Sequence, residues 1–269
     1  MNVNNKVCVI TGGAGMLGEQ FAVALLEAGG IVYILDINES LVKMKAEELN
    51  KLYGPKCFGI VADITNERSI SDACSFILQR SHSVDVLINN AANNPKVEKN
   101  ETINFSQLGY FPLEQWNKDI AVGLTGAFVC SKIFGTEMEK RNYGVIINIS
   151  SDLGIIAPDQ RLYEIEGLSE NQQPKKPVSY SVVKHGLIGL TKYLATYWAN
   201  KGIRVNSLCP GGVFVDQPDD FVQKISKLIP MGRMAIKSEY QKAIVFLASN
   251  ASSYMTGQNL IIDGGRSCW

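Results

Sequence analysis

Short apolar runs alternate with helix-patterned segments along the chain, and this alternation limits the folds open to it. Strands are predicted at 6–10, 31–36, 57–63, 84–92, 144–150, 203–210 and 259–263. Helices are predicted at 17–28, 39–52, 66–79, 113–140, 178–199 and 237–248. Strands that are apolar on both faces and separated by helices pair into a parallel sheet covered on both sides. No linker or internal repeat interrupts the pattern, so residues 1–269 are expected to form a single α/β domain.

The composition excludes several classes of protein. Hydrophobic residues make up 46% of the chain, enough for a sizeable core and too many for a disordered chain. Lys plus Arg and Asp plus Glu each number 26, so neither a nucleic acid nor a membrane surface is expected as a partner. The apolar run before Thr11 is too short for a signal peptide, and a cytoplasmic location is expected. The scattered cysteines are expected to be reduced, and the two histidines argue against a histidine-based metal site.

The segment TGGAGMLG, from Thr11 to Gly18, follows the first predicted strand and opens the first helix. Glycines let a backbone turn tightly and approach a pyrophosphate, whose charge a helix N-terminus favours. Asp36 ends the second predicted strand, at the spacing of an acid that accepts hydrogen bonds from both ribose hydroxyls. A carboxylate there repels a 2′-phosphate, and Ile37 and Ala14 offer no positive charge, so NAD is expected rather than NADP. A strand-end acid that only caps the next turn is the competing interpretation of Asp36.

Further motifs follow in a characteristic order: NNAA (89–92), NISSDLG (148–154), YSVVK (180–184), PGG (210–212) and DGG (263–265). Together with TGGAGMLG, they resemble the short-chain dehydrogenase/reductase family over nearly the whole chain. The resemblance implies one Rossmann-like domain, with a doubly wound sheet of seven parallel strands and helices on both faces. It also implies an NAD(H)-dependent oxidoreductase that assembles as a homodimer or homotetramer.

The resemblance assigns roles to individual residues. Tyr180 is the implied proton-transfer group, and Ser151 is expected to hold the substrate oxygen. Lys184 lies one helical turn beyond Tyr180, where its cation is expected to lower the pKa of the phenol and to bind the nicotinamide ribose. Asp63 and Ile64 are expected to meet the adenine. The full set of expected cofactor residues is Gly12, Gly15, Met16, Leu17, Gly18, Asp36, Ile37, Asp63, Ile64, Asn90, Ala91, Tyr180, Lys184, Pro210, Gly211 and Val213.

Two features resemble parts of this site but are not expected to belong to it. Tyr197 and Lys201 repeat the spacing of the catalytic pair, but they lie at the far end of the same predicted helix and point elsewhere. His185 adjoins Lys184, but neighbouring helix positions face different ways, so a structural role is expected.

The chain departs from the family pattern at two positions. Met16 stands where the short branch of the family has a glycine, and the spacing of the remaining glycines is that of a longer branch with many nucleotide-sugar enzymes. Gly123 stands where the family carries an asparagine that holds a water beside the catalytic lysine. Its absence is compatible with a different proton relay, with lower activity, or with a protein that binds the cofactor without chemistry.

An insertion at residues 159–177 makes the interval between Ser151 and Tyr180 more than twice that usual in the family. It is polar and returns on the substrate side, as does the connection 93–112. A lid or binding loop is one interpretation, and a solvated loop or subunit contact is the other. Because both of these segments are polar and border the substrate side, a polar substrate is expected. Candidate residues for binding an anionic group are Lys96, Arg161, Lys175, Lys176 and Arg233.

These observations leave three hypotheses. The first is an NAD-dependent oxidoreductase that interconverts a secondary alcohol and a ketone on a sugar or sugar phosphate. PGGVF, QPDDFV and the final Trp269 resemble a subgroup associated with surface-carbohydrate synthesis and flagellin modification. The second is a 3-oxoacyl or other small-ketone reductase, against which Asp36 speaks. The third is a non-catalytic NAD(H)-binding sensor or scaffold, motivated by Gly123.

Overall fold

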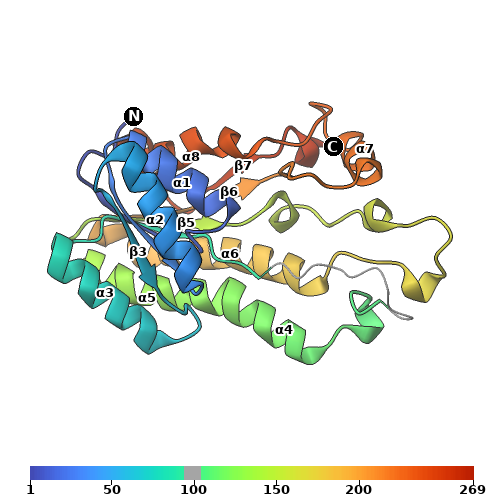
Figure 1. Cartoon of the computed structure of the whole chain (residues 1–269), viewed down its shortest axis with the longest axis horizontal. Helices are drawn as coiled ribbons and strands as arrows, with labels where there is room; N and C mark the ends of the chain where they lie inside the picture. The colour runs from blue at the N-terminus through green and yellow to red at the C-terminus, as the bar shows by residue number, and fades with distance from the viewer. Residues whose placement is uncertain (94–103) are drawn as a thin grey trace.

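The computed structural model describes residues 1–93 and 104–269, and these form a single seven-stranded sheet (Figure 1). The strands are parallel and lie in the order β3-β2-β1-β4-β5-β6-β7. Their bounds are β1 Val7–Thr11, β2 Ile31–Asp36, β3 Cys57–Val61, β4 Val86–Asn89, β5 Gly144–Ile149, β6 Ile203–Pro210 and β7 Asn259–Ile262. The predicted α/β class and seven-stranded sheet are confirmed.

Helices cover both faces of the sheet. One face carries α1 (Met16–Glu27), α2 (Glu39–Tyr53) and α8 (Gln241–Ala248), and the other carries α3 (Glu67–Ser81), α5 (Gly126–Lys140) and α6 (Val178–Tyr197). The shorter helices α4 (Leu113–Ile120) and α7 (Asp219–Ser226) flank the site described below.

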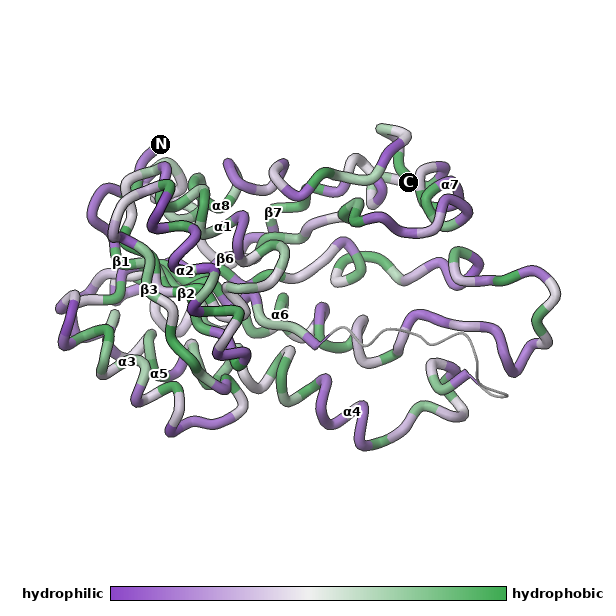
Figure 2. The backbone as a smooth tube through the Cα atoms, in the orientation of Figure 1, coloured by the Kyte–Doolittle hydropathy of each residue, from purple (hydrophilic) through white to green (hydrophobic). Residues whose placement is uncertain are grey.

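Buried side chains of the central strands point alternately to the two helical layers. Ile10 is in register with Ile34 and Ile88, and all three belong to the core under α1 and α8. The preceding residue, Val9, belongs to the opposite core. This two-sided burial explains why the strands are apolar runs without alternation (Figure 2).

The strand order creates a crevice at the carboxyl ends of β1 and β4. The chain moves outward from β1 to β2 and β3, then crosses back to β4 on the other side of β1. Successive crossovers therefore leave β1 in opposite directions. Ligands of open parallel sheets bind at this kind of switch point.

Two predicted helices are less regular than expected. The predicted helix 113–140 is continuous in space, but a π-helical turn at Ala121–Thr125 separates α4 from α5. Its length and composition alone would allow it to cross a membrane, but half of its most apolar window is buried in the fold, as in a core helix. The predicted helix 237–248 begins as a 3₁₀ turn, Lys237–Tyr240, before α8.

The insertion at 159–177 forms a wall that extends beyond the carboxyl edge of the sheet, between α4 and α7 (Figure 1). It contains the 3₁₀ turns Gln160–Tyr163 and Glu170–Gln172. Leu162 is buried in a small apolar cluster with Ile225, Ile229 and Met234 around α7. The interpretation as a purely solvated loop is therefore wrong for this half of the insertion.

The second half of the insertion is tied to the connection that precedes α4. The backbone N–H of Asn104 donates to the carbonyl of Asn171 at 3.1 Å. The backbone N–H of Lys175 donates to Ser106 Oγ at 2.8 Å. Because the insertion is held on both sides, the segment that leads from it into α6 has a fixed path.

Candidate active site

The glycine-rich loop after β1 exposes backbone without side chains at the carboxyl edge of the sheet. Gly12 has a φ of +58°, and a Cβ there would lie 2.8 Å from the Cα of Ala91. Gly15 faces open space, because its Cβ would meet only the Gly12 carbonyl, at 3.3 Å. Gly18 instead packs α1 against the loop, and a side chain there would collide with that same carbonyl. Gly18 lines neither cleft described below, so its expected cofactor contact is not seen.

Hydrogen bonds from the end of β4 fix this loop. Asn90 Nδ2 donates to the carbonyls of Thr11 at 3.1 Å and Gly12 at 3.0 Å. Thr11 Oγ1 accepts from the backbone N–H groups of Asn90 and Ala91 at 3.0 and 3.1 Å. Asn90 therefore positions the loop backbone as well as lining the crevice.

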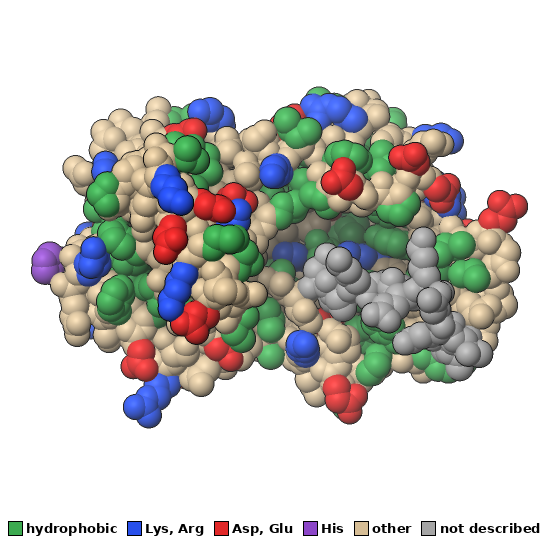
Figure 3. Space-filling view, in the orientation of Figure 1, with side chains coloured by type: hydrophobic (Ala, Val, Ile, Leu, Met, Phe, Trp, Pro, Cys, Tyr) green, Lys and Arg blue, Asp and Glu red, His purple; other side chains and the backbone are tan. Residues whose placement is uncertain are grey.

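Two adjoining clefts run along the carboxyl edge of the sheet (Figure 3). They share Met16, Leu17, Asn90 and Ala92, so they form one channel. The first, of about 410 Å³, is lined by ten of the expected cofactor residues: Gly12, Gly15, Met16, Leu17, Asp36, Ile37, Asp63, Ile64, Asn90 and Ala91. The second, of about 330 Å³, is lined by Tyr180, Lys184, Pro210, Gly211, Val213 and Ser151.

Asp36 lies at the far end of the first cleft. Its carboxylate accepts the backbone N–H of Ala14 at 3.3 Å and that of Asn38 at 3.1 Å. The interpretation of Asp36 as a turn cap is therefore correct, but it does not exclude the ribose role, because the carboxylate also lines the cleft. Within the described part of the chain, no Lys or Arg lines this cleft.

Ser151, Tyr180 and Lys184 converge in the second cleft. Ser151 follows β5, and the other two lie one turn apart near the start of α6. Lys184 is buried, and its Nζ donates to the carbonyl of Ile149 at 2.8 Å. Ser151 is also buried, and its Oγ donates to Asp152 at 2.7 Å. The β5 edge and the α6 helix thus bring together three groups that are distant in sequence.

The pKa of Tyr180 differs from the expectation. Burial raises the pKa of its phenol above the ordinary value, the hydrogen bond with Ser151 lowers it, and the charge of Asp152 raises it. Lys184 Nζ lies 5.6 Å from the centroid of the Tyr180 ring and is itself buried. Burial, together with the nearby Lys176 cation, lowers the pKa of Lys184 to about 8. In the protein alone, burial therefore outweighs the lowering of the tyrosine pKa that we expected from Lys184.

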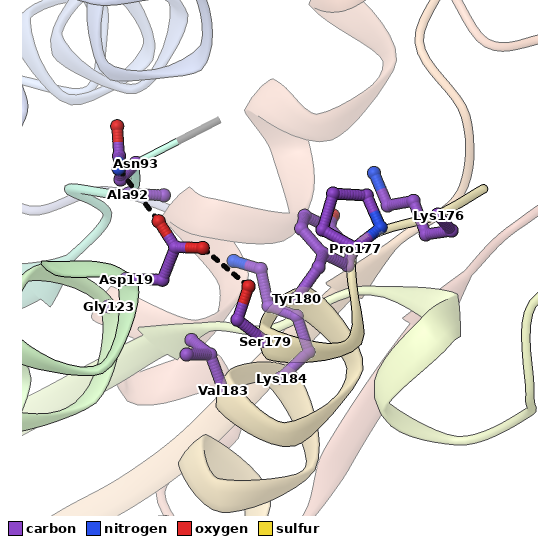
Figure 4. Close-up of a pocket in the computed structure, with 10 residues that line it drawn as sticks. All are labelled: Ala92, Asn93, Asp119, Gly123, Lys176, Pro177, Ser179, Tyr180, Val183 and Lys184. Atoms are coloured by element: carbon purple, nitrogen blue, oxygen red, sulfur yellow. Dashed lines mark hydrogen bonds between the residues drawn. The ribbon is translucent and has the colours of Figure 1, made fainter. Parts of the chain in front are cut away.

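A small pocket beside Ser151, Tyr180 and Lys184 shows why residue 123 has no side chain. It is lined by Gly123, Val183, Asp119, Tyr180 and Lys184, among others (Figure 4). A Cβ at Gly123 would lie 2.5 Å from Val183 Cγ1, so the valine fills the space that a side chain at 123 would need.

Asp119, one helical turn before Gly123, supplies the polar group of that pocket. Its carboxylate is buried and accepts from Asn93 Nδ2 at 2.7 Å, from Gln115 Nε2 at 2.7 Å and from Ser179 Oγ (Figure 4). These bonds link α4 to the start of α6. Asp119 was not predicted from the sequence, where it is one of several polar residues of a helix and belongs to none of the motifs.

A buried ion pair forms the floor of the second cleft. Arg266 Nη1 donates to Asp152 Oδ2 at 2.8 Å, and the two side chains are only 6% and 4% exposed. Asp152 Oδ1 accepts from Ser151 Oγ and from the backbone N–H of Leu153, at 2.7 and 2.8 Å. Asp152 thus orients the serine, and its own oxygens are all engaged. Both charged residues were missed, although Asp152 lies within the motif NISSDLG and Arg266 directly follows DGG.

Most of the candidate anion-binding residues are placed away from the second cleft or are neutralised. Arg161 pairs with Asp159 at 2.7 Å and Arg233 with Glu239 at 2.7 Å, both exposed, and Lys175 lies 4.0 Å from Glu164. Lys96 lies outside the described residues. Lys176 alone of this set lines the second cleft.

The two features expected to lie outside the site do so. Tyr197 is exposed and stacks on Tyr193, with ring centroids 5.9 Å apart. Lys201 lies 3.5 Å from Glu139. His185 is exposed and bonds to the carbonyl of Ser181. In the residues described, no group of three or more His, Cys, Asp or Glu side chains is placed to hold a metal ion.

Comparison with known proteins identifies the family. Residues 13–267 match a family model described as "Enoyl-(Acyl carrier protein) reductase". An NAD-dependent glycerol dehydrogenase of Listeria innocua is 31% identical, over 98% of this chain and 94% of that protein. A 3-oxoacyl-(acyl-carrier-protein) reductase of Aquifex aeolicus is 30% identical, over 98% of both chains. The chain belongs to the short-chain dehydrogenase/reductase family.

Two further relatives are similar over nearly their whole length. The post-translational flagellin modification protein A of Campylobacter coli is 28% identical, over 98% of both chains. The crystal structure of an NAD⁺-bound xylitol dehydrogenase has a TM-score of 0.84 and 26% identity, and the match covers 97% of this chain and 99% of that one. As a short-chain dehydrogenase/reductase, the protein is an oxidoreductase that uses a nicotinamide cofactor to interconvert alcohols and ketones.

The channel fits such a cofactor. Bare loop backbone at Gly12 and Gly15 lies beside the N-terminus of α1, where a pyrophosphate is favoured. An acid lies at one end of the channel, and the tyrosine and lysine lie at the other.

Proposed function

We propose that this short-chain dehydrogenase/reductase uses NAD(H) to interconvert a secondary alcohol and a ketone on a polar substrate, a sugar or sugar phosphate. The observation that carries the proposal is the convergence of Ser151, Tyr180 and Lys184 in a cleft continuous with the one that contains Asp36. The cofactor, when bound, accepts or donates the hydride.

The three side chains have distinct tasks. Tyr180 Oη takes the proton from the alcohol in oxidation and returns it to the carbonyl oxygen in reduction. Ser151 Oγ holds that same oxygen, and Asp152 fixes the orientation of the serine. Lys184 is held by the carbonyl of Ile149, which keeps its cation beside the tyrosine.

NAD is proposed over NADP because of charge at the adenosine end of the channel. Asp36 places a carboxylate where a 2′-phosphate would lie, and the described lining offers no cation to offset it.

The lining of the second cleft supports a polar substrate. Lys176, Asp152 and Arg266 line it, together with Tyr163 from the insertion. Such groups suit hydroxyls and charged substituents better than an acyl chain or a steroid. Relatives named as glycerol dehydrogenase and xylitol dehydrogenase agree with a polyhydroxylated substrate. The similarity to a flagellin modification protein supports a role in surface glycan or flagellin modification. The proposal places this role in the cytoplasm.

The test is NADH absorbance after mixing the protein with NAD or NADP and a panel of polyols, sugars, sugar acids and sugar phosphates. Tyr180→Phe serves as the blank. The expected result is tyrosine-dependent NADH formation with one class of substrate, and a Tyr180→Phe variant that still binds NADH. Turnover that survives this substitution would contradict the assignment.

A 3-oxoacyl reductase is the second candidate, because relatives carry that name. It predicts oxidation of NADPH in the presence of a 3-oxoacyl thioester, at a rate above that of any sugar. The third hypothesis, a cofactor-binding scaffold without chemistry, loses its motive, because Val183 occupies the space beside Gly123 and the catalytic trio is complete.

A further inference from the structure

Lys176 belongs to the insertion and lies beside the catalytic Tyr180. It lies where the insertion returns to α6, and its Nζ is 3.7 Å from the centroid of the Tyr180 ring. It lines both the second cleft and the small pocket beside Lys184. Its backbone N–H donates to Gln160 Oε1 at 2.9 Å, so the start of the insertion fixes its position.

The charge of Lys176 is not balanced by the residues that the structure describes around it. Within residues 1–93 and 104–269, its Nζ has neither an ion pair nor a hydrogen bond to an acceptor. Asp152, the carboxylate whose charge acts on Lys176, already accepts hydrogen bonds from Arg266, Ser151 and Leu153. The charged residues that line the second cleft are Lys176, Lys184, Arg266 and Asp152, so its cations outnumber its carboxylate.

Partial burial makes this unbalanced charge costly. The pKa of Lys176 is lowered to about 8, mainly by burial; the charge of Asp152 opposes this lowering and that of Arg266 adds to it. A partly buried ammonium without a carboxylate partner is unfavourable in the unliganded protein. An anionic ligand would remove this cost, because it would bring the missing charge into the cleft.

We propose that Lys176 binds an anionic group of the substrate, a carboxylate or a phosphate close to the carbon that is oxidised. This inference rests on the proposed function and narrows its substrate to sugar acids or sugar phosphates. The short distance between Nζ and the Tyr180 ring places the anion near the reacting carbon rather than at the far end of the substrate.

The alternative role for Lys176 is to tune Tyr180 without touching the substrate. A cation above the phenol ring stabilises its ionised form, and this effect is the same for charged and neutral substrates. The two roles are separable because an anion-binding residue discriminates between a substrate and its uncharged counterpart.

The experiment compares Lys176→Met with Lys175→Met. Lys175 is the matched control: it is the preceding residue, lies 4.0 Å from Glu164, and does not line the second cleft. The protein saturated with NADH, which cannot accept a hydride from these alcohols, is titrated calorimetrically with D-gluconate and sorbitol, with glycerol 3-phosphate and glycerol, and with inorganic phosphate. Binding is measured without turnover, so a protein that fails to oxidise the panel still reports on Lys176.

The expected result is at least tenfold tighter binding of an anion than of its uncharged counterpart. Lys176→Met should abolish that preference and leave the weak binding of the neutral compound unchanged. Lys175→Met should retain the preference. Preference for gluconate would identify a carboxylate, and preference for glycerol 3-phosphate or inorganic phosphate would identify a phosphate. Equal losses for charged and neutral compounds, or no Lys176-dependent binding of any of the three anions, would overturn the inference.

Discussion

At the scale of single residues, the charge of Asp36 governs which dinucleotide the channel accepts. Asp36→Ser should lower the preference for NAD over NADP at least tenfold, about 1.4 kcal/mol, because the repulsion of a 2′-phosphate is removed. Titration with NADH and NADPH, followed by their fluorescence, measures the ratio. Asp63→Asn, a second acid in the same cleft, is the control and should leave the ratio unchanged. A ratio unaffected by Asp36→Ser would mean that Asp36 only caps its turn.

The buried pair of Asp152 and Arg266 has a structural consequence that can be measured. In the described structure, Asp152 is the only carboxylate paired with the guanidinium of Arg266, which is 6% exposed. Asp152→Asn removes this partner, so the free energy of unfolding should fall by about 3–5 kcal/mol. Glu39→Gln, in an exposed pair with Lys43, should leave the free energy of unfolding nearly unchanged. Urea denaturation checks both variants. Equal, small effects would show that the pair in the cleft is not needed for the fold.

Lys176 should illustrate a trade-off between binding and stability. Its pKa of about 8 lies below the ordinary 10.5, so between these pH values the unfolded chain binds more protons and the free energy of unfolding rises with pH. Lys176→Met should therefore stabilise the cofactor-free protein at pH 7, by about 1–3 kcal/mol, and the gain should vanish near pH 10.5. The groups facing Lys176 are Tyr180, Asp152, Arg266 and Lys184. Denaturant unfolding at several pH values measures the difference, and a gain independent of pH would contradict this account.

Some of these residues could be predicted from the sequence and others could not. Tyr180 and Lys184 share one helix, so local spacing alone places them on one face. Asp152 and Arg266 are 114 residues apart, and only the arrangement of β5 and the chain after β7 brings them together. Likewise, Arg233 appeared free in the sequence, but the fold pairs it with Glu239.

At the scale of elements, the π-helical turn between α4 and α5 fixes the surroundings of Gly123. Gly123→Asn introduces the family's usual side chain into space held by Val183, and overpacking should cost about 1–3 kcal/mol and reduce turnover. The double variant with Val183→Ala should recover part of both losses, since the clash is relieved. Thermal unfolding and NADH formation check the pair of variants. No recovery in the double variant would show that Val183 is not the obstacle.

The elements themselves were largely predictable, because their apolar periodicity reflects burial on one or both sides. The sheet, α2 and α3 match the predictions closely. The π-helical turn was not predictable, since its residues continue the helical pattern without a proline, and the single glycine within it, Gly123, does not indicate a π-turn. The insertion was predicted to be polar, with a lid and a solvated loop both left open. The packing of its first half against α7 was not predicted, because the single apolar Leu162 is too weak a signal.

At the scale of the whole molecule, we propose that the chain self-associates through the outer surfaces of α5 and α6. The two helices pack together through Ala127, Val183 and Leu187, yet Phe128 and Tyr193 on the same helices are 49% and 63% exposed. Exposed apolar side chains on adjacent helices are typical of a protein interface. A second copy of the chain would cover both helices at once through a two-fold interface, as expected for a homodimer or homotetramer.

This assembly can be tested by light scattering on the purified protein. The unmodified chain should have the mass of a dimer or tetramer, and Phe128→Lys with Tyr193→Lys should shift it to a smaller species, because two charges would be buried at the interface. Leu52→Lys, at a 74% exposed apolar position on α2, is the control and should leave the mass unchanged. Neither substituted residue lines the channel, so NADH binding should persist and report an intact fold. A monomeric unmodified protein, or an unchanged mass in the double variant, would place the association elsewhere or exclude it, and the catalytic cleft would then have to function within one chain.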